Sequence, residues 1–436
     1  MDIILKNGHI VDPSSGLDSI GHVVIQGGKI KKITALPHEL QNELQISPQT
    51  QVIDAEGLYV FPGFVDMHVH LRDPGYTHKE TIASGSQAGV KGGFTTLCCM
   101  PNTNPPNDNE TITRYIVQKG LSEGACNVWP IGAITKRQEG KELSEMGIMK
   151  DSGCVAFSDD GHTVTNSLVM RRALEYSMVF DVPIISHAED IWLAEGGVMN
   201  EGRLSTLLGL NGIPAEAEVI MIKRDIELAA LTGGRLHIAH VSTAGGVKAI
   251  REAKSIGINV TAETTPHYLH ITEDCVDGYN TLAKVNPPLR GKKDVEAIRD
   301  ALRDGTIDCI ATDHAPHHMD DKECEFDMAA FGISGLETAL ALGLRLVEEG
   351  VLSLSALIEK MTVKPSNILK LGKGTLKEGA EADIIVVDIN RDFTVDMESL
   401  VSKGKNTPFH GWHLKGICVL TIVGGQMRYN QLGGSL

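Results

Sequence analysis

The chain has 436 residues, of which 42% are hydrophobic and 22% are charged, and its formal net charge is -16. This length suits one large domain with an appendage, or two domains. The negative charge argues against nucleic acid and anionic membranes as partners, and no apolar run reaches the roughly 18 residues that a membrane-spanning helix needs.

Both ends of the chain predict short antiparallel strands. Residues 1 to about 60 contain alternating runs such as "IILKNGHIVD" and "HVVIQGGKIKKI", divided by Gly, Asn and Asp. The last sixty or so residues contain similar runs, such as "ADIIVVD" and "GICVLTIVGGQMRY". Because chain termini often lie close together, we expect residues 1–60 and 371–436 to form one small β-sandwich domain.

Residues 61–370 predict alternating strands and helices. The expected strands cover residues 64–70, 94–100, 127–135, 154–160, 182–189, 235–241, 258–268 and 307–316. Helical stretches lie between them, including residues 215–233, 245–257 and 292–305, and residues 335–350 follow the last strand. These units predict an α/β fold, a (β/α)8 TIM-type barrel. The alternative is an open doubly wound sheet, but no GxGxxG sequence follows a strand, so nothing favours dinucleotide binding.

Residue types that bind metals or move protons stand at the ends of several of these strands. The carboxyl ends of barrel strands surround the active site, so we expect these side chains to meet at one mouth. They are His68 and His70, Asp159 and Asp160, His187 and Glu189, His240, and Asp313, His314 and His317.

The pattern of these residues indicates a metal centre. A single histidine at a strand end is more often an ordinary polar residue, but His68 and His70 share one face of a strand and form a natural clamp. Histidine and carboxylate ligands without cysteine suit zinc or another borderline divalent ion. Six candidate ligands exceed what one catalytic zinc needs, whereas two metals that share a carboxylate would use all six. The expected chemistry is metal-assisted hydrolysis of a carbonyl compound, or its reverse.

The eight cysteines form no CxxC pair, and most lie in apolar runs such as "TTLCCM". This pattern favours reduced thiols in the cytoplasm over a disulfide framework or a cysteine zinc site. The N-terminal residues also lack the basic and apolar regions of a signal peptide.

Several segments resemble the dihydroorotases of pyrimidine biosynthesis, within the amidohydrolase superfamily, and most of all the longer bacterial type. They are "FPGFVDMHVHLRDPG", "GGFTTLCCMPNTNPP", "FSDDG", "ISHAED", "IAHVS", "NPPLR" and "IATDHAPH". The HxH pair is common to the superfamily, whereas "HLRDPG" with "MPNTNPP" is much more specific. The resemblance covers nearly the whole chain and implies reversible cyclisation of N-carbamoyl-L-aspartate to (S)-dihydroorotate.

The resemblance also implies a two-zinc centre. His68, His70 and Asp313 would hold one zinc, His187 and His240 would hold the other, and Asp160 would bridge them. Many superfamily members bridge the metals with a carbamylated lysine, but "CVAFSDDG" contains no lysine. Asp313 is implied as general base and then acid, taking a proton from the bridging water and delivering it to the ring nitrogen. The alternative is that Asp313 only orients an imidazole.

The implied substrate-binding residues are a further set. Arg72 and Asn102 would grip the substrate carboxylate beside His70 and His317, because arginine offers a planar donor fork. Asn286 and the Phe331–Gly332 backbone would bind the ring amides. Asn102 could instead stabilise a turn, and Gly332 could be an ordinary loop glycine. His267 is interpreted as a support for the site or the fold.

Two other functions remain as alternatives. A hydantoinase or allantoinase would share the fold and the HxH pair, but it usually keeps the bridging lysine and lacks the Arg72–Asn102 pairing. A non-catalytic subunit that scaffolds aspartate carbamoyltransferase would tend to lose metal ligands, and here all six remain. The sequence leaves open whether the chain forms a homo-oligomer or associates with that transferase.

Overall fold

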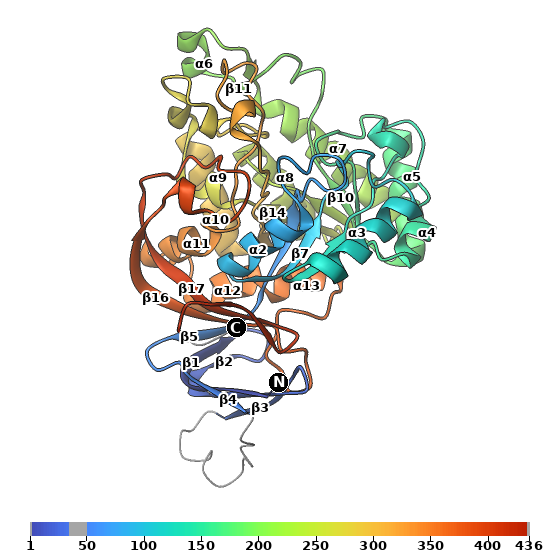
Figure 1. The fold of residues 1–436 in the computed structure, drawn as a ribbon. Coiled ribbons are helices and arrows are strands. Elements are labelled where there is room, and N and C mark those ends of the chain that lie inside the picture. The colour runs from blue at the N-terminus through green and yellow to red at the C-terminus, as the bar shows by residue number, and fades with distance from the viewer. Residues whose placement is uncertain (1, 35–49, 434–436) are drawn as a thin grey trace.

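A computed structural model describes residues 2–34 and 50–433, and its centre is a closed barrel of parallel strands (Figure 1). One sheet pairs β6, β7 and β8, and another pairs β15, β14, β13, β10 and β9 in that order. Two parallel bridges, Gly132 with Phe157 and Val69 with His314, join the sheets into a ring. The strands are β6 (Phe64–Val69), β7 (Phe94–Cys99), β8 (Asn127–Pro130), β9 (Phe157–Ser158), β10 (Ile184–Ser186), β13 (Leu236–Ile238), β14 (Val260–Thr264) and β15 (Cys309–Ile310).

Helices connect these strands and cover the outside of the ring. In the first described helix the sequence supplies both caps: Thr81 begins it with a capping box, and Gly93 ends it with a φ of 92°. The helices are α2 (Ile82–Gly92), α3 (Glu110–Glu123), α4 (Met146–Asp151), α5 (Ser167–Ser177), α6 (Arg203–Leu208), α7 (Ala215–Thr232), α8 (Ala244–Ser255), α9 (Pro266–His270), α10 (Lys292–Asp304), α11 (Ala339–Glu348), α12 (Leu354–Met361) and α13 (Val363–Leu369).

Both ends of the chain enter one eight-stranded sheet beside the barrel, where the blue and red strands of Figure 1 meet. The order is β18-β17-β16-β5-β1-β2-β3, and β4 pairs with β1. The two ends join where β5 pairs antiparallel with β16. The strands are β1 (Ile3–Asp12), β2 (Leu17–Gln26), β3 (Lys29–Thr34), β4 (Gln51–Asp54), β5 (Tyr59–Pro62), β16 (Ile384–Thr394), β17 (His413–Val423) and β18 (Gln426–Asn430).

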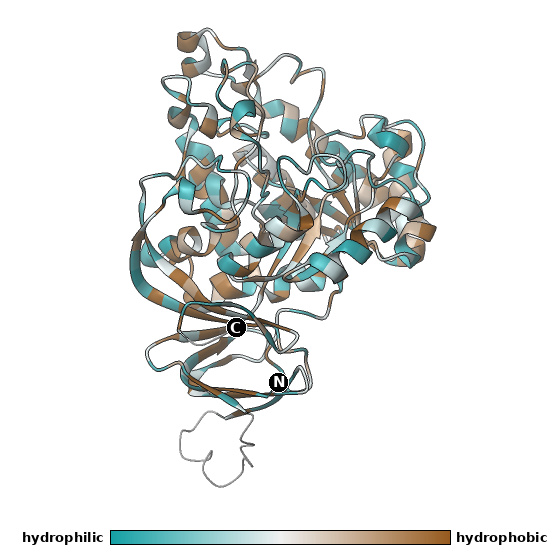
Figure 2. Ribbon diagram, viewed as in Figure 1, coloured by the Kyte–Doolittle hydropathy of each residue, from teal (hydrophilic) through white to brown (hydrophobic). Residues whose placement is uncertain are grey.

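The buried side chains explain this arrangement. β6 and β7 are buried along their whole length, as expected of parallel strands covered on both faces. Figure 2 shows brown, hydrophobic residues along the central strands and the terminal sheet, while the helices carry both colours. Within the described residues, no helix combines the length and apolar character that crossing a membrane requires.

The predicted (β/α)8 barrel with a second domain built from both termini is therefore confirmed. The barrel strands are shorter than predicted, because their polar ends leave the hydrogen-bonded ladder and turn into the loops. The segment between β10 and α7 also contains a small excursion, in which β11 (Met199–Asn200) pairs with β12 (Gly212–Ile213). The division of the chain at residues 60/61 and 370/371 stays a prediction, and positions 35–49 lie outside the described residues.

Candidate metal centre and substrate cavity

The polar strand ends converge on one cavity of about 210 Å³ at the barrel mouth. Every residue of the predicted metal and substrate sets lines this cavity except His68, which is fully buried. The lining residues are His70, Arg72, Asn102, Asp160, Gly161, His187, His240, Asn286, Asp313, Ala315, His317, Phe331 and Gly332.

Asp160 lies at the centre of the histidine cluster. Its Oδ1 is 3.4 Å from His68 Nε2, 3.4 Å from His240 Nε2 and 3.5 Å from His187 Nδ1. Its Oδ2 is 3.4 Å from His70 Nε2. One carboxylate therefore contacts all four imidazoles, which is the position that a bridging ligand would need.

Asp313 follows β15 and approaches the same cluster from the opposite side of the bridge between Val69 and His314. Its Oδ1 lies 3.0 Å from His70 Nε2 and 3.5 Å from His68 Nε2. Among the described residues, three groups of three ligand atoms are compact enough to hold an ion, and two of them belong to this cluster: His68–His70–Asp313 and His68–Asp160–His240. The third, His237–Glu263–Cys309, is also buried. His187 joins the second group, because its Nδ1 lies 2.9 Å from His240 Nε2.

The donor atoms fit a divalent metal. Ligands of a tetrahedral zinc, with bonds of about 2.1 Å, lie about 3.4 Å from one another, close to most of the separations measured here. His68 Nε2 and Asp160 Oδ1 are also buried without a hydrogen-bond partner among the described residues. Buried polar atoms are nearly always paired, so these two point to an ion at this position.

Burial and neighbouring charges shift the pKa values in this cluster in opposite directions. Burial alone would raise the pKa of Asp160, but His68, His187 and His240 hold that pKa well below its usual value. Burial alone would likewise lower the pKa of His187, whereas Asp160 and Glu189 raise it to about 10. The carboxylates therefore favour positive charge at the centre, which protons or a metal cation can supply.

Two hydrogen bonds orient the histidine pair from the side away from the cluster. Glu263, on β14, accepts a hydrogen bond from His68 Nδ1 at 2.6 Å, and its other oxygen lies 3.3 Å from His237 Nε2. Asn102 Oδ1 accepts from His70 Nδ1 at 2.8 Å. Each contact leaves the Nε2 atom of its histidine directed at the cluster. The sequence reasoning missed Glu263, although it too stands in a strand that leads to the mouth.

The left-handed backbone occurs at three of the candidate residues. Arg72 has a φ of 60°, His240 a φ of 33° and Asp313 a φ of 45°. Residues other than glycine seldom adopt such values, and those that do are concentrated at functional sites.

Arg72 and His317 form one wall of the cavity. The Arg72 Nε donates to the carbonyl of Pro316 at 3.3 Å, and its Nη2 lies 3.2 Å from His317 Nε2. Burial lowers the pKa of Arg72 to about 10, so the guanidinium is charged at neutral pH. Burial, together with Arg72 and Lys79, holds the pKa of His317 far below its usual value. This neutral imidazole donates through Nε2 to the carbonyl of Phe331 at 2.9 Å.

The Phe331–Gly332 backbone is largely engaged within the protein. The Gly332 N–H donates to the carbonyl of Lys284 at 3.0 Å, and the Gly332 carbonyl accepts from Asn406 Nδ2 at 2.9 Å. A carbonyl oxygen can accept two hydrogen bonds, so Phe331 and Gly332 keep acceptor capacity toward a ligand.

Two buried lysines tie this wall to the neighbouring loop. Lys322 Nζ donates to the carbonyls of Thr281, Lys284 and Ala330 at 3.1, 3.1 and 2.6 Å. Lys284 Nζ lies 4.6 Å from the centre of the Phe331 ring, within cation–π range. Both lysines were missed, because a buried lysine in a loop has no signature in the sequence.

Asn286 and His267 are two further residues named from the sequence. Asn286 lines the cavity and donates to Glu189. His267 is buried, and burial lowers its pKa to about 3. Its Nε2 has no hydrogen-bond partner among the described residues, and its interpretation as a supporting residue stays a prediction.

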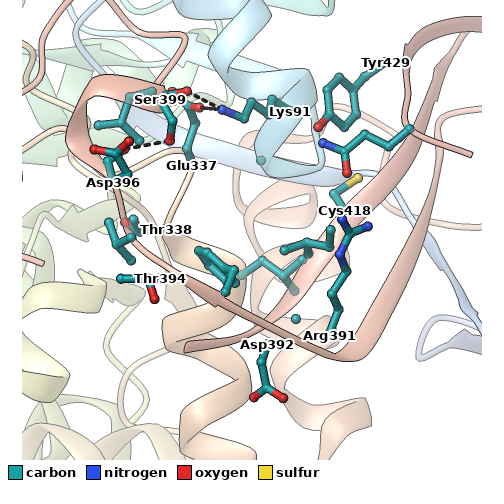
Figure 3. Close-up of a pocket in the computed structure, with 18 residues that line it drawn as sticks. Lys91, Glu337, Thr338, Arg391, Asp392, Thr394, Asp396, Ser399, Cys418 and Tyr429 are labelled. Atoms are coloured by element: carbon teal, nitrogen blue, oxygen red, sulfur yellow. Dashed lines mark hydrogen bonds and ion pairs between the residues drawn. The ribbon is translucent and has the colours of Figure 1, made fainter. Parts of the chain in front are cut away.

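A second cavity, of about 390 Å³, lies away from this cluster, between α2, α11 and the β16–β17 pair (Figure 3). None of the predicted site residues lines it. Lys91 pairs there with Glu337 at 2.7 Å and donates to the carbonyl of Ser399 at 2.8 Å. The charge of this lysine is therefore satisfied within the protein.

Comparison with known proteins gives a consistent result. A family model described as dihydro-orotase-like matches residues 57–245, and one described as amidohydrolase family matches residues 216–429. The dihydroorotase of Geobacter metallireducens is 53% identical over 431 residues, covering 99% of this chain and 100% of its own. The dihydroorotase of Trichlorobacter lovleyi is 54% identical over 430 residues, with the same coverage.

Solved structures extend the likeness to cyclic amide hydrolases. The L-hydantoinase (dihydropyrimidinase) of Arthrobacter aurescens superposes with a TM-score of 0.88 at 28% identity, over 100% of this chain and 97% of its own. The dihydropyrimidinase of Brevibacillus agri has a TM-score of 0.85 at 22% identity, over 99% and 95%, and shows the shared fold alone.

Proposed function

This chain belongs to the dihydroorotase family of the amidohydrolases, and from that premise we propose that it interconverts N-carbamoyl-L-aspartate and (S)-dihydroorotate in pyrimidine biosynthesis. One observation carries the proposal: a single cavity combines the metal-ligating cluster with Arg72 and Asn102. The metal-ligating cluster suits hydrolysis of an amide, and Arg72 with Asn102 suits a substrate that carries a carboxylate.

The metal complement is the first part of the proposal. The family is metal-dependent, and we propose two zinc ions, with His68, His70 and Asp313 at one, His187 and His240 at the other, and Asp160 between them. Divalent ions bound here would acidify a water molecule and polarise the scissile carbonyl. The contacts of Asp160 with the imidazoles on both sides support its role as the bridge.

The substrate carboxylate is held by the arginine wall. Asn102 accepts from His70 through Oδ1, so its amide nitrogen is left to donate to a ligand. The Arg72 guanidinium, held by the carbonyl of Pro316, supplies the matching charge. His317 donates to the Phe331 carbonyl through Nε2, and its ring lies beside the arginine, with Nε2 3.2 Å from Arg72 Nη2.

Asp313 moves the proton. Burial alone would raise its pKa, but His68 and His70 hold that pKa below its usual value, so it is a carboxylate at neutral pH. In ring opening it accepts a proton from the attacking water as the oxygen bonds to the carbonyl carbon. It then donates that proton to the ring nitrogen as the carbon–nitrogen bond breaks. Ring closure runs through the same steps in reverse.

The cellular compartment of the enzyme is a further part of the proposal. All eight cysteines are free, which supports the cytoplasm as its compartment. Self-association and association with aspartate carbamoyltransferase stay open.

The test is a comparison of substrates on one preparation. We expect turnover of dihydroorotate and N-carbamoyl-L-aspartate, little turnover of hydantoin or allantoin, and zinc in the same sample by elemental analysis. Turnover of hydantoin without dihydroorotate would contradict the proposal.

A further inference from the structure

The side-chain amide of Asn286 has hydrogen-bond partners for its nitrogen but not for its oxygen. It follows η5 (Thr281–Ala283), and its Nδ2 lies 3.1 and 3.0 Å from the two carboxylate oxygens of Glu189. Its Oδ1 is buried without a hydrogen-bond partner among the described residues. Asn286 lines the 210 Å³ cavity, whereas Glu189 does not.

The Glu189 carboxylate fixes the orientation of the Asn286 amide. An ionised glutamate only accepts hydrogen bonds, so the nitrogen of Asn286 must face Glu189 and the oxygen must face the other way. The oxygen is then the end available to a ligand in the cavity. A buried acceptor without a donor is costly, so a ligand that supplies an N–H at this wall gains affinity.

We propose that Glu189 is a positioning residue that presents Asn286 as a hydrogen-bond acceptor and thereby selects substrates with an N–H on this side of the ring. The inference rests on the proposed function and adds a specificity determinant to it. Dihydroorotate carries two ring N–H groups, and N-carbamoyl-L-aspartate carries a ureido N–H and an NH₂. The same acceptor can therefore serve both directions of the reaction.

A competing role for Glu189 would act through the metal centre. Its Oε2 lies 3.8 Å from His187 Nε2, which is longer than a hydrogen bond. Both carboxylate oxygens are instead within hydrogen-bond distance of Asn286. The experiment must still separate the two roles, so metal content accompanies every kinetic measurement.

The decisive variants are Glu189→Gln and the double exchange Glu189→Gln with Asn286→Asp. Glutamine can offer either its oxygen or its nitrogen to Asn286, so the single variant no longer fixes the amide. The double variant keeps the total charge and restores an oxygen toward the cavity, because both ends of an aspartate accept. Glu195→Gln, an exposed change in the same loop, is the matched control.

Each metal-loaded enzyme is assayed with dihydroorotate and with its two singly N-methylated forms. We expect the single variant to raise KM for dihydroorotate at least about tenfold with kcat and metal content near wild type. We also expect its preference for the N–H substrate over one N-methyl form to fall at least about tenfold, and the double variant to recover much of both losses. Intrinsic differences in reactivity cancel, because each analogue is compared across enzymes.

Three results would overturn the inference: an unchanged KM, a loss of metal, or a double variant no better than the single one. Failure of the proposed function is separate, because it appears as wild-type enzyme that ignores dihydroorotate. In that case the same variants are compared on the cyclic N–H compound that the wild-type enzyme does hydrolyse, and an unchanged KM there counts equally against the inference.

Discussion

Glu263 and His68 are 195 positions apart in the chain, yet the Glu263 Oε1 lies 2.6 Å from the His68 Nδ1 at the floor of the metal centre. Both side chains are fully buried. Burial alone would raise the pKa of Glu263, but His68 and His237 hold it well below its usual value. The carboxylate thus fixes the tautomer and the orientation of the imidazole.

The first prediction is that Glu263→Gln weakens metal binding about 10- to 100-fold. The glutamine oxygen can still accept from His68, but the charge that strengthens the imidazole as a ligand is lost. Competition with a chromophoric chelator measures the effect, and Glu252→Gln, an exposed change on α8, is the control. Equal metal affinity in the two variants would mean that the charge of Glu263 does not support the metal site.

The second prediction is that Arg72→Lys raises KM for dihydroorotate at least about tenfold, because a lysine keeps the charge but loses the planar fork. We also expect the wild-type enzyme to hydrolyse dihydrouracil weakly, and because this compound lacks the carboxylate its rate should change little in the variant. Steady-state kinetics on both compounds test this, with the exposed Arg114→Lys as control. Equal losses on both compounds would argue against a carboxylate grip.

The third prediction is that Asp313→Asn lowers kcat by about 10²- to 10⁴-fold, because an amide cannot accept the proton. Asp313 also contacts two of the proposed metal ligands, His68 and His70, so the variant is assayed at saturating zinc and its metal content is measured. Asp320→Asn, exposed in the following loop, should behave as wild type. A metal-loaded Asp313→Asn variant with near-normal kcat would rule out the proton-transfer role.

The fourth prediction concerns the backbone at Gly332, where φ is +146° and an added Cβ would lie 2.6 Å from the Ala315 carbonyl oxygen. Gly332→Ala should lower the free energy of unfolding by about 1–3 kcal/mol and raise KM, since the loop must shift. Gly350→Ala is the matched control, because φ there is also positive and no atom lies within 4 Å of the added Cβ. Urea unfolding of the two variants measures what the clash and the more extreme φ at Gly332 add to the cost of an ordinary positive φ.

The fifth prediction concerns Lys322, whose pKa is lowered to about 7 by burial and by Lys284. An unfolded lysine has a pKa of about 10.4, so between about pH 7 and 10 the unfolded chain binds more protons and stability rises with pH. Lys322→Met should be less stable throughout, because the carbonyls around the amine lose their donor, and should lack this rise. Urea midpoints near pH 7 and near pH 9 test this, with the exposed Lys292→Met as control.

The barrel and the cluster of polar strand ends could be predicted from the sequence because both follow from local patterns. A buried parallel strand is a short apolar run, and its carboxyl end is where His70, His187 or Asp313 follows. Strand lengths were overestimated: residues 307–316 were expected as a strand, but β15 covers only Cys309–Ile310. The chain leaves the ladder there so that its polar residues can turn toward the mouth.

The supporting contacts could not be predicted, because they depend on partners distant in the chain. Nothing in "INVTAETTPHY" indicates that Glu263 faces His68, and nothing near Lys322 indicates that three carbonyls surround it. Glu189 was noted as a strand-end residue, but its contact with Asn286 spans 97 positions. Such contacts appear only when the ring of strands has formed.

The bridge between Val69 and His314 has a consequence for when the protein acquires its chemistry. The two strands that it joins are the first and the last of the ring, and they carry His68, His70 and Arg72 on one side and Asp313 and His317 on the other. A chain emerging from the ribosome therefore keeps Asp313 and His317 apart from His70 and Arg72 until the eighth strand docks beside the first. Completion of the His68–His70–Asp313 group and of the arginine wall becomes a late event of biogenesis, and it reports that the ring has closed.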